Sequence, residues 1–229
     1  MDLNLLSTLT ERLRAESIGD PEWVESKEAF EYSTQSIEVV AVLKVVRAAQ
    51  GLHALDLLCR SGLFIDMGAI YRCIDDCNSE VYFLLENYPI ESSDVQRFIK
   101  AFFATTIDSD LSAKTEYVLT KKIHGAVARV ITGMEQHEST QARLLRVYKT
   151  FCGYTHANYS NIMEIYGGAY PDLSFNVAGV ASVHQRDTNM KTVEQAYLSV
   201  LYSLAFIAQK LKLNNLFIEI WSHHESLSV

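Results

Sequence analysis

Two groups of polar side chains interrupt otherwise apolar segments, and they contain the residues best suited to chemistry. In the first group, Arg72 is followed at helical spacing by Asp75 and Asp76, and His53 lies on a similar stripe of an earlier segment. Side chains three, four and seven residues apart share one face of a helix, so the two stripes can meet where their helices pair. An unpaired charge between helices is costly, and we therefore expect Arg72 to form an ion pair with Asp75 or Asp76. The cluster is either a structural ion-pair network or a ligand pocket.

The second group is the run Gly153 to Ser160, which reads GYTHANYS within a segment that is otherwise apolar. A histidine among hydroxyl and amide groups can act as a general base, ligate a metal or donate to a phosphate, because an imidazole titrates near neutral pH. The alternative is a buried histidine that only hydrogen-bonds to its neighbours. We take His156 and Arg72 as the catalytic candidates, and the candidate ligand-binding residues are His53, Asp75, Asp76, Tyr154, Asn158 and Tyr159.

Several known catalytic and metal-binding motifs are missing from the sequence. It has no glycine-rich phosphate loop, no Gly-x-Ser-x-Gly elbow, no His-Glu-x-x-His helix and no repeated Glu-x-x-His pair. Cys73 and Cys77 lie one helical turn apart, but no Cys-x-x-Cys or paired histidine spacing accompanies them. The sequence therefore predicts no metal site and no cofactor, and we expect its four cysteines to be reduced thiols.

Charge and hydropathy narrow the possible partners and location. Lys and Arg number 20 against 28 Asp and Glu, and the net charge of -8 repels a phosphate backbone, so no duplex DNA is expected as a partner. The nearest approach to a basic run, Lys121-Lys122 with His124, is interpreted as a solvated helix face. Charged residues break the longest apolar region, and the acidic N-terminus does not resemble a secretory signal. We predict a cytoplasmic protein without a membrane partner.

Helical periodicity covers most of the chain and positions both polar groups. We expect one all-α domain over residues 1–229, a multi-helix bundle of about six to eight helices built on a long antiparallel helical hairpin. Residues 1–35 are expected to form an N-terminal helical arm and 168–188 an irregular loop, with Gly153 as a possible kink. The expected helices span residues 3–16, 21 to about 32, 37–60, 63–87, about 92–107, 114–132, 139–166 and 189–221. Amphipathic bundles commonly assemble across a two-fold axis, which favours a homodimer.

The segments Ala69 to Asp76 (AIYRCIDD) and Tyr154 to Ala157 (YTHA) support a resemblance to a known family. Together they resemble an uncharacterised all-helical bacterial group related to the HEPN (higher eukaryotes and prokaryotes nucleotide-binding) superfamily. The resemblance implies an arginine and acidic residue on one helix and a histidine on a later one. Members of the wider superfamily resemble metal-independent ribonucleases or nucleotide-binding modules, and the ribonucleases use an arginine and a histidine about four to six residues apart on one helix.

Three functions from different classes follow from these observations. The first is a HEPN-like helical module that binds a nucleotide or short RNA, in a bacterial stress or defence system. The second is a helical interaction or scaffold protein without catalysis, and the third is a metal-dependent helical-bundle enzyme. The sequence leaves open whether the chain is an enzyme, and a cleft shared by Arg72 and His156 would favour the first function over the second.

Overall fold

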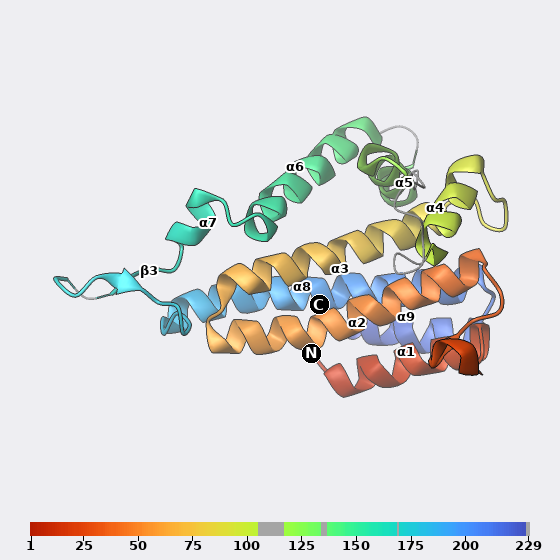
Figure 1. Cartoon of the computed structure of the whole chain (residues 1–229), viewed down its shortest axis with the longest axis horizontal. Coiled ribbons are helices and arrows are strands. Elements are labelled where there is room, and N and C mark those ends of the chain that lie inside the picture. The colour runs from red at the N-terminus through yellow and green to blue at the C-terminus, as the bar shows by residue number, and fades with distance from the viewer. Residues whose placement is uncertain (105–116, 134–136, 169, 228–229) are drawn as a thin grey trace.

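A computed structural model of the chain describes residues 1–104, 117–133, 137–168 and 170–227. Within these ranges it contains nine α-helices and two short β-hairpins, which confirms the predicted all-α bundle (Figure 1). The helices are α1 (Leu3–Ser17), α2 (Ile37–Ser61), α3 (Phe64–Leu85), α4 (Ser93–Phe103), α5 (Thr120–Thr132), α6 (His137–Thr155), α7 (Tyr159–Met163), α8 (Val183–Lys210) and α9 (Asn214–Leu227). The strands are β1 (Glu22–Val24), β2 (Ala29–Glu31), β3 (Tyr166–Gly167) and β4 (Ser174–Phe175), and a 3-10 turn (Glu25–Lys27) joins the first two.

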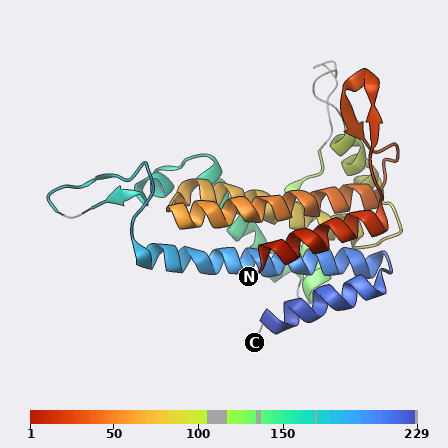
Figure 2. The same ribbon diagram turned by 90° about the horizontal axis from the view of Figure 1, so that it is seen from below.

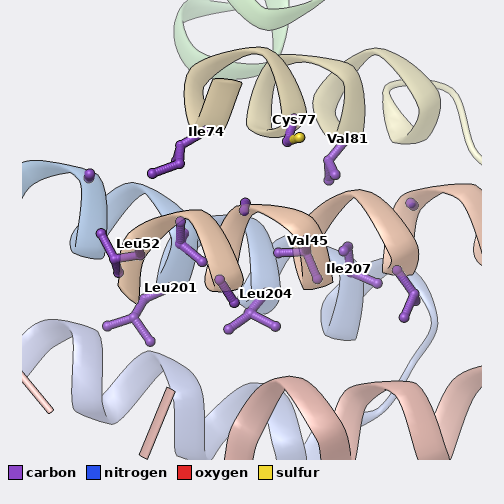
Figure 3. Packing of buried hydrophobic residues seen from close by; sticks show 14 of the residues in the cluster. Val45, Leu52, Ile74, Cys77, Val81, Leu201, Leu204 and Ile207 are labelled. Carbon is purple, nitrogen blue, oxygen red and sulfur yellow. The ribbon is translucent and has the colours of Figure 1, made fainter. Parts of the chain in front are cut away.

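Helix α2 forms the centre of the bundle, as its apolar residues on nearly every side predict. Val45 and Leu52 are fully buried, and Figure 3 shows α2 packed against both α3, which contributes Ile74, and α8, which contributes Leu204. Gly62 caps α2 in the left-handed conformation, with φ of +71°, and turns the chain into α3. The predicted antiparallel hairpin is therefore present.

The remaining helices cover this centre on two sides. Helices α1 and α9 pack against α8, and α1 also contacts α2 through the buried residues Leu6, Leu9 and Leu13. Helices α5 and α6 lie on the other side, over α3 (Figure 1). No described helix is long and apolar enough to cross a membrane.

The helix predicted after Pro21 is wrong, because residues 22–31 form an antiparallel hairpin. Trp23 pairs with Phe30 across the strands, with ring centroids 5.1 Å apart, and Glu28 occupies the left-handed region at the turn. Two residues seven positions apart share a helix face, but the same spacing places them opposite one another in this hairpin. Periodicity alone did not distinguish these two structures.

Two further helices predicted as continuous are interrupted. The terminal helix divides into α8 and α9 at Leu211 to Leu213, where Lys212 adopts φ of +61° and the Leu213 amide donates to the Ala208 carbonyl at 2.9 Å. The segment 139–166 divides into α6 and α7, and the break follows Ala157, at φ of +50°, rather than Gly153. These two breaks raise the number of helices above the predicted range.

The predicted loop 168–188 is shorter than expected. Helix α8 already begins at Val183, with the Ser182 side chain accepting from the Gln185 amide at 3.3 Å. The loop includes β4, which pairs with β3 in an arm that projects from one end of the bundle, while the β1–β2 hairpin projects from the other end (Figure 2). The predicted helix at 114–132 begins at Thr120, and its residues 114–116 lie outside the described ranges, as do residues 105–107 of the preceding one.

Candidate functional site

A cavity of about 280 Å³ lies where α3, α4, α5 and α6 meet. Helix α3 contributes Arg72, Asp76 and Glu80 to its wall, and α2 contributes Lys44. The opposite walls are largely aromatic and apolar, and they come from α4, the chain leading into α5, α5 itself and α6. These remaining lining residues are Phe98, Ala101, Phe102, Tyr117, Val118, Thr120, Ile123, His124 and Tyr148.

Arg72 is the most buried cation of this cavity, with a relative exposure of 8%. Its guanidinium lies over the ring of Tyr148, 3.7 Å from the centroid, and it forms an ion pair with Asp76 one turn along α3. The predicted ion pair between Arg72 and an aspartate is thus confirmed. Burial lowers the pKa of Arg72, but its interactions with Asp76, and further with Cys152 and Tyr148, outweigh this effect and raise the pKa above its ordinary value. The Nε of Arg72 has no hydrogen-bond partner among the described residues.

A second ion pair lies beside the first. Lys44 Nζ is 2.5 Å from a carboxylate oxygen of Glu80, and it also lies over the rings of Phe98 and Phe102 at 5.5 and 5.2 Å. Burial raises the pKa of Glu80, and the charge of Lys44 opposes this shift. The cavity wall therefore contains two cations, each held by a carboxylate and an aromatic surface.

His124 joins Arg72 and Lys44 in the cavity wall. The prediction from the sequence that it lies on a solvated helix face is wrong. Its neighbours Lys121 and Lys122 are exposed as predicted, but His124 is 1% exposed and meets the Tyr148 ring edge-to-face at 5.3 Å. Burial, and then the positive charge of Arg72, lower its pKa, so the imidazole is neutral at pH 7. Its Nδ1 has no hydrogen-bond partner in the described part of the chain.

The GYTHANYS run lies away from this cavity. His156, Asn158 and Tyr159 are exposed at the end of α6 and the start of α7, and none of them lines the cavity. Tyr154 packs its ring against Gly68 of α3 and donates from its hydroxyl to Glu164 at 2.9 Å. Burial, followed by the hydrogen bond with Glu164, raises the pKa of Tyr154 to about 12. The described cavity therefore does not unite Arg72 with His156.

His53 likewise does not line the cavity, because its side chain contacts α1. His53 Nε2 is 2.9 Å from the Ser7 hydroxyl, so this side chain joins α2 to α1. An Arg and a His at the spacing of the superfamily's ribonucleases do occur at Arg47 and His53, but residues six apart in a regular helix point about 120° away from each other. Arg47 instead lies toward α3 and the Cys73 thiol. A hydrogen bond with Cys77, and further the charge of Arg47, lower the pKa of Cys73 against the effect of burial. The two side chains do not converge.

Asp75 is half-buried and has no ion pair with a described residue, and it makes the stability of the fold depend on pH. Burial raises the pKa of Asp75 to about 6, although the charge of Arg72 opposes the shift. An aspartate in an unfolded chain titrates near about pH 4, so the folded state holds this proton more tightly. The resulting stability is fully present below about pH 4 and is lost as the pH rises through about 6.

Asp75→Asn is therefore expected to exceed the wild type in free energy of unfolding by about 1 to 3 kcal/mol at pH 8, and to lose that advantage at pH 4. Urea unfolding at both pH values measures the difference. Asp66→Asn, at an exposed site on the same helix, is the control and should stay within about 0.5 kcal/mol of wild type. Equal effects of Asp75→Asn at pH 4 and pH 8 would contradict the role of its ionisation.

Metal ligands do not gather in the described part of the structure. Over residues 1–104, 117–133, 137–168 and 170–227, no three His, Cys, Asp or Glu side chains lie in an arrangement that can hold a metal ion. Comparisons of this chain with protein-family models, curated proteins and solved structures found no match.

Proposed function

We propose that the chain binds a small anionic ligand with a planar aromatic group, a mononucleotide or the terminal nucleotide of a short RNA, in the cavity around Arg72. The observation that carries this proposal is the buried guanidinium of Arg72, which lines the cavity and whose Nε has no acceptor among the described residues. A buried donor without a partner costs about 1 to 3 kcal/mol, and an anionic oxygen of a ligand removes this cost.

The ion pair with Asp76 is compatible with ligand binding. The Asp76 side chain is 41% exposed. Water can therefore replace the guanidinium as its hydrogen-bond donor when Arg72 donates to a phosphate instead. The Tyr148 ring holds the guanidinium plane in place during such an exchange. Arg72 can therefore act as the anion-binding group without leaving a buried carboxylate unpaired.

The aromatic walls supply the second half of the recognition. Phe98, Phe102 and Tyr117 line the side of the cavity away from Arg72's own helix, and a nucleobase stacks on such rings by about 1 to 3 kcal/mol per base. The neutral His124 adds a buried nitrogen without a partner among the described residues, and this nitrogen can accept from or donate to a base edge or a sugar hydroxyl. Small-molecule sites commonly combine mostly apolar walls with a few polar groups in this way.

Titration calorimetry with adenosine monophosphate, and with a single-stranded RNA of about six nucleotides, tests this proposal. Inorganic phosphate and adenosine report the two halves of the ligand separately. Arg72→Met keeps the apolar stem and removes the charge, and it is expected to weaken nucleotide binding at least about thirtyfold, because a desolvated charge pair is lost. Arg60→Met, at an exposed arginine on α2 that is not part of the cavity wall, is the matched control and should bind like wild type.

The same titration with His156→Ala tests the prediction made from the sequence. His156 lies outside the cavity wall, and we expect the variant to bind a nucleotide with wild-type affinity. Loss of binding in the folded variant would extend the site to the end of α6. Failure of the folded wild type to bind any of these ligands would contradict the proposal and favour a scaffold protein without a ligand.

A further inference from the structure

The β1–β2 hairpin presents an exposed aromatic pair at one end of the molecule. Trp23 and Phe30 retain 51% and 67% of their accessible surface, although they pack against each other. An isolated two-stranded hairpin is only marginally stable in water, and tryptophan is among the residues that contribute most to protein interfaces. The projecting hairpin, visible in Figure 2, therefore has the form of a docking element.

The same hairpin is strongly acidic, which defines the chemistry of its partner. Glu22 lies directly across from Glu31, an arrangement that is unfavourable without counter-charges, and Lys27 is placed to pair only with Glu31. Glu22 and Glu28 are exposed and have no ion pair within the described part of the chain. A partner must therefore combine positive charge with a surface that fits an indole ring, and arginine side chains meet both requirements.

A surface of this kind exists on the outer face of α6. Arg143 and Arg146 lie one turn apart on this face, Val147 lies one turn beyond Arg143 with 38% exposure, and Lys149 lies one turn beyond Arg146 at the edge of the face. All three cations are exposed. We refer to these four residues as the α6 ridge. None of its three cations forms an ion pair with a described residue, although the chain carries a net charge of -8. The ridge is thus an unneutralised basic surface on an acidic protein.

The hairpin and the ridge do not meet within one molecule. Figure 1 shows α6 on one side of the bundle and the hairpin near α1 on the other side. Two copies can bring them together, and in a symmetric pair each copy supplies one hairpin and one ridge, so that the contact forms twice and closes.

We propose that the β1–β2 hairpin docks on the α6 ridge of a second copy of this chain. Carboxylates of Glu22 and Glu28 pair with the ridge guanidinium groups, and Trp23 stacks on an arginine beside Val147. Charge complementarity favours this occupant over a nucleic acid, because phosphates would neutralise the ridge but leave the acidic, aromatic hairpin without a partner. The inference does not depend on ligand binding in the cavity around Arg72.

Analytical ultracentrifugation with a charge-swap series tests the inference. The wild type is expected to form dimers at about 0.1 M salt and to dissociate more readily at about 1 M, where charges are screened. Arg143→Glu with Arg146→Glu, or Glu22→Lys with Glu28→Lys, should each raise the dissociation constant of the dimer at least about tenfold, because like charges then face each other. Mixing the two folded double variants restores association, since the reversed charges are complementary again.

A control variant with the same change in net charge as the ridge variant separates the effect of the ridge from that of overall charge. Lys191→Glu with Lys212→Glu alters exposed sites away from the ridge and should dimerise like wild type. A monomeric wild type, or double variants that do not recover on mixing, would overturn the inference. The inference would also be overturned if the ridge variant lost affinity for RNA while its sedimenting mass stayed that of the wild type. That result would assign the ridge to a nucleic acid.

Discussion

Arg72→Ala is expected to lower the free energy of unfolding by about 2 to 4 kcal/mol, which denaturant unfolding at pH 7 measures. The substitution removes an ion pair, a guanidinium–aromatic contact and the packing of a long, buried stem between α3 and α6. Removing one partner of a fully buried pair costs about 3 to 5 kcal/mol. The expected loss is somewhat smaller because the Asp76 left behind is 41% exposed and becomes hydrated.

The control for this prediction is a second arginine that pairs with an aspartate along its own helix. Arg60 lies 2.8 Å from Asp56 and its own side chain is 64% exposed, whereas Asp56 is 8% exposed. Arg60→Ala therefore removes the partner of a buried carboxylate without removing a buried stem, and it should cost less stability than Arg72→Ala. If both alanine variants lose equally little stability, the Arg72 cluster behaves as a solvated surface. That outcome would also weaken the argument for a buried anion-binding group.

The sequence was most informative where apolar residues covered a long segment. The many apolar positions of α2 predicted a central helix, and Ser61-Gly62 predicted the turn into α3, both of which the structure contains. Helix breaks at a left-handed residue other than glycine left no comparable signal. Lys212 at φ of +61° ends α8 where glycine would have been expected, and nothing in its residue type predicts that break.

The candidate site was predicted only in part, for a related reason. Arg72 and Asp76 are one turn apart on one helix, so helical spacing alone was sufficient to predict their ion pair. His124, Lys44 and Tyr148 come from three other helices, and their meeting depends on how α5 and α6 cross α3. A signal for His124 existed, because it shares a helix face with Val127 and Ala128, which are buried. The adjacent Lys121 and Lys122 favoured the interpretation of the whole segment as a solvated helix face.

Gly62→Ala is expected to be among the most destabilising single substitutions in the chain, at about 3 to 5 kcal/mol in free energy of unfolding. At φ of +71° a Cβ brings strain, and here it would also overlap the backbone carbonyl of Val180, which cannot move aside as a flexible side chain can. Gly19→Ala is the matched control, since Gly19 has φ of +67° with no atom near its Cβ position, and it should cost only the strain of about 1 to 2 kcal/mol. The difference between the two variants therefore measures the close contact between the α2–α3 turn and the segment that leads into α8, where the Val180 amide donates to the Gly62 carbonyl at 2.9 Å. Hydrogen exchange of the Val180 amide should accelerate in Gly62→Ala alone, and equal losses of stability in the two variants would show that this segment yields to the added methyl group.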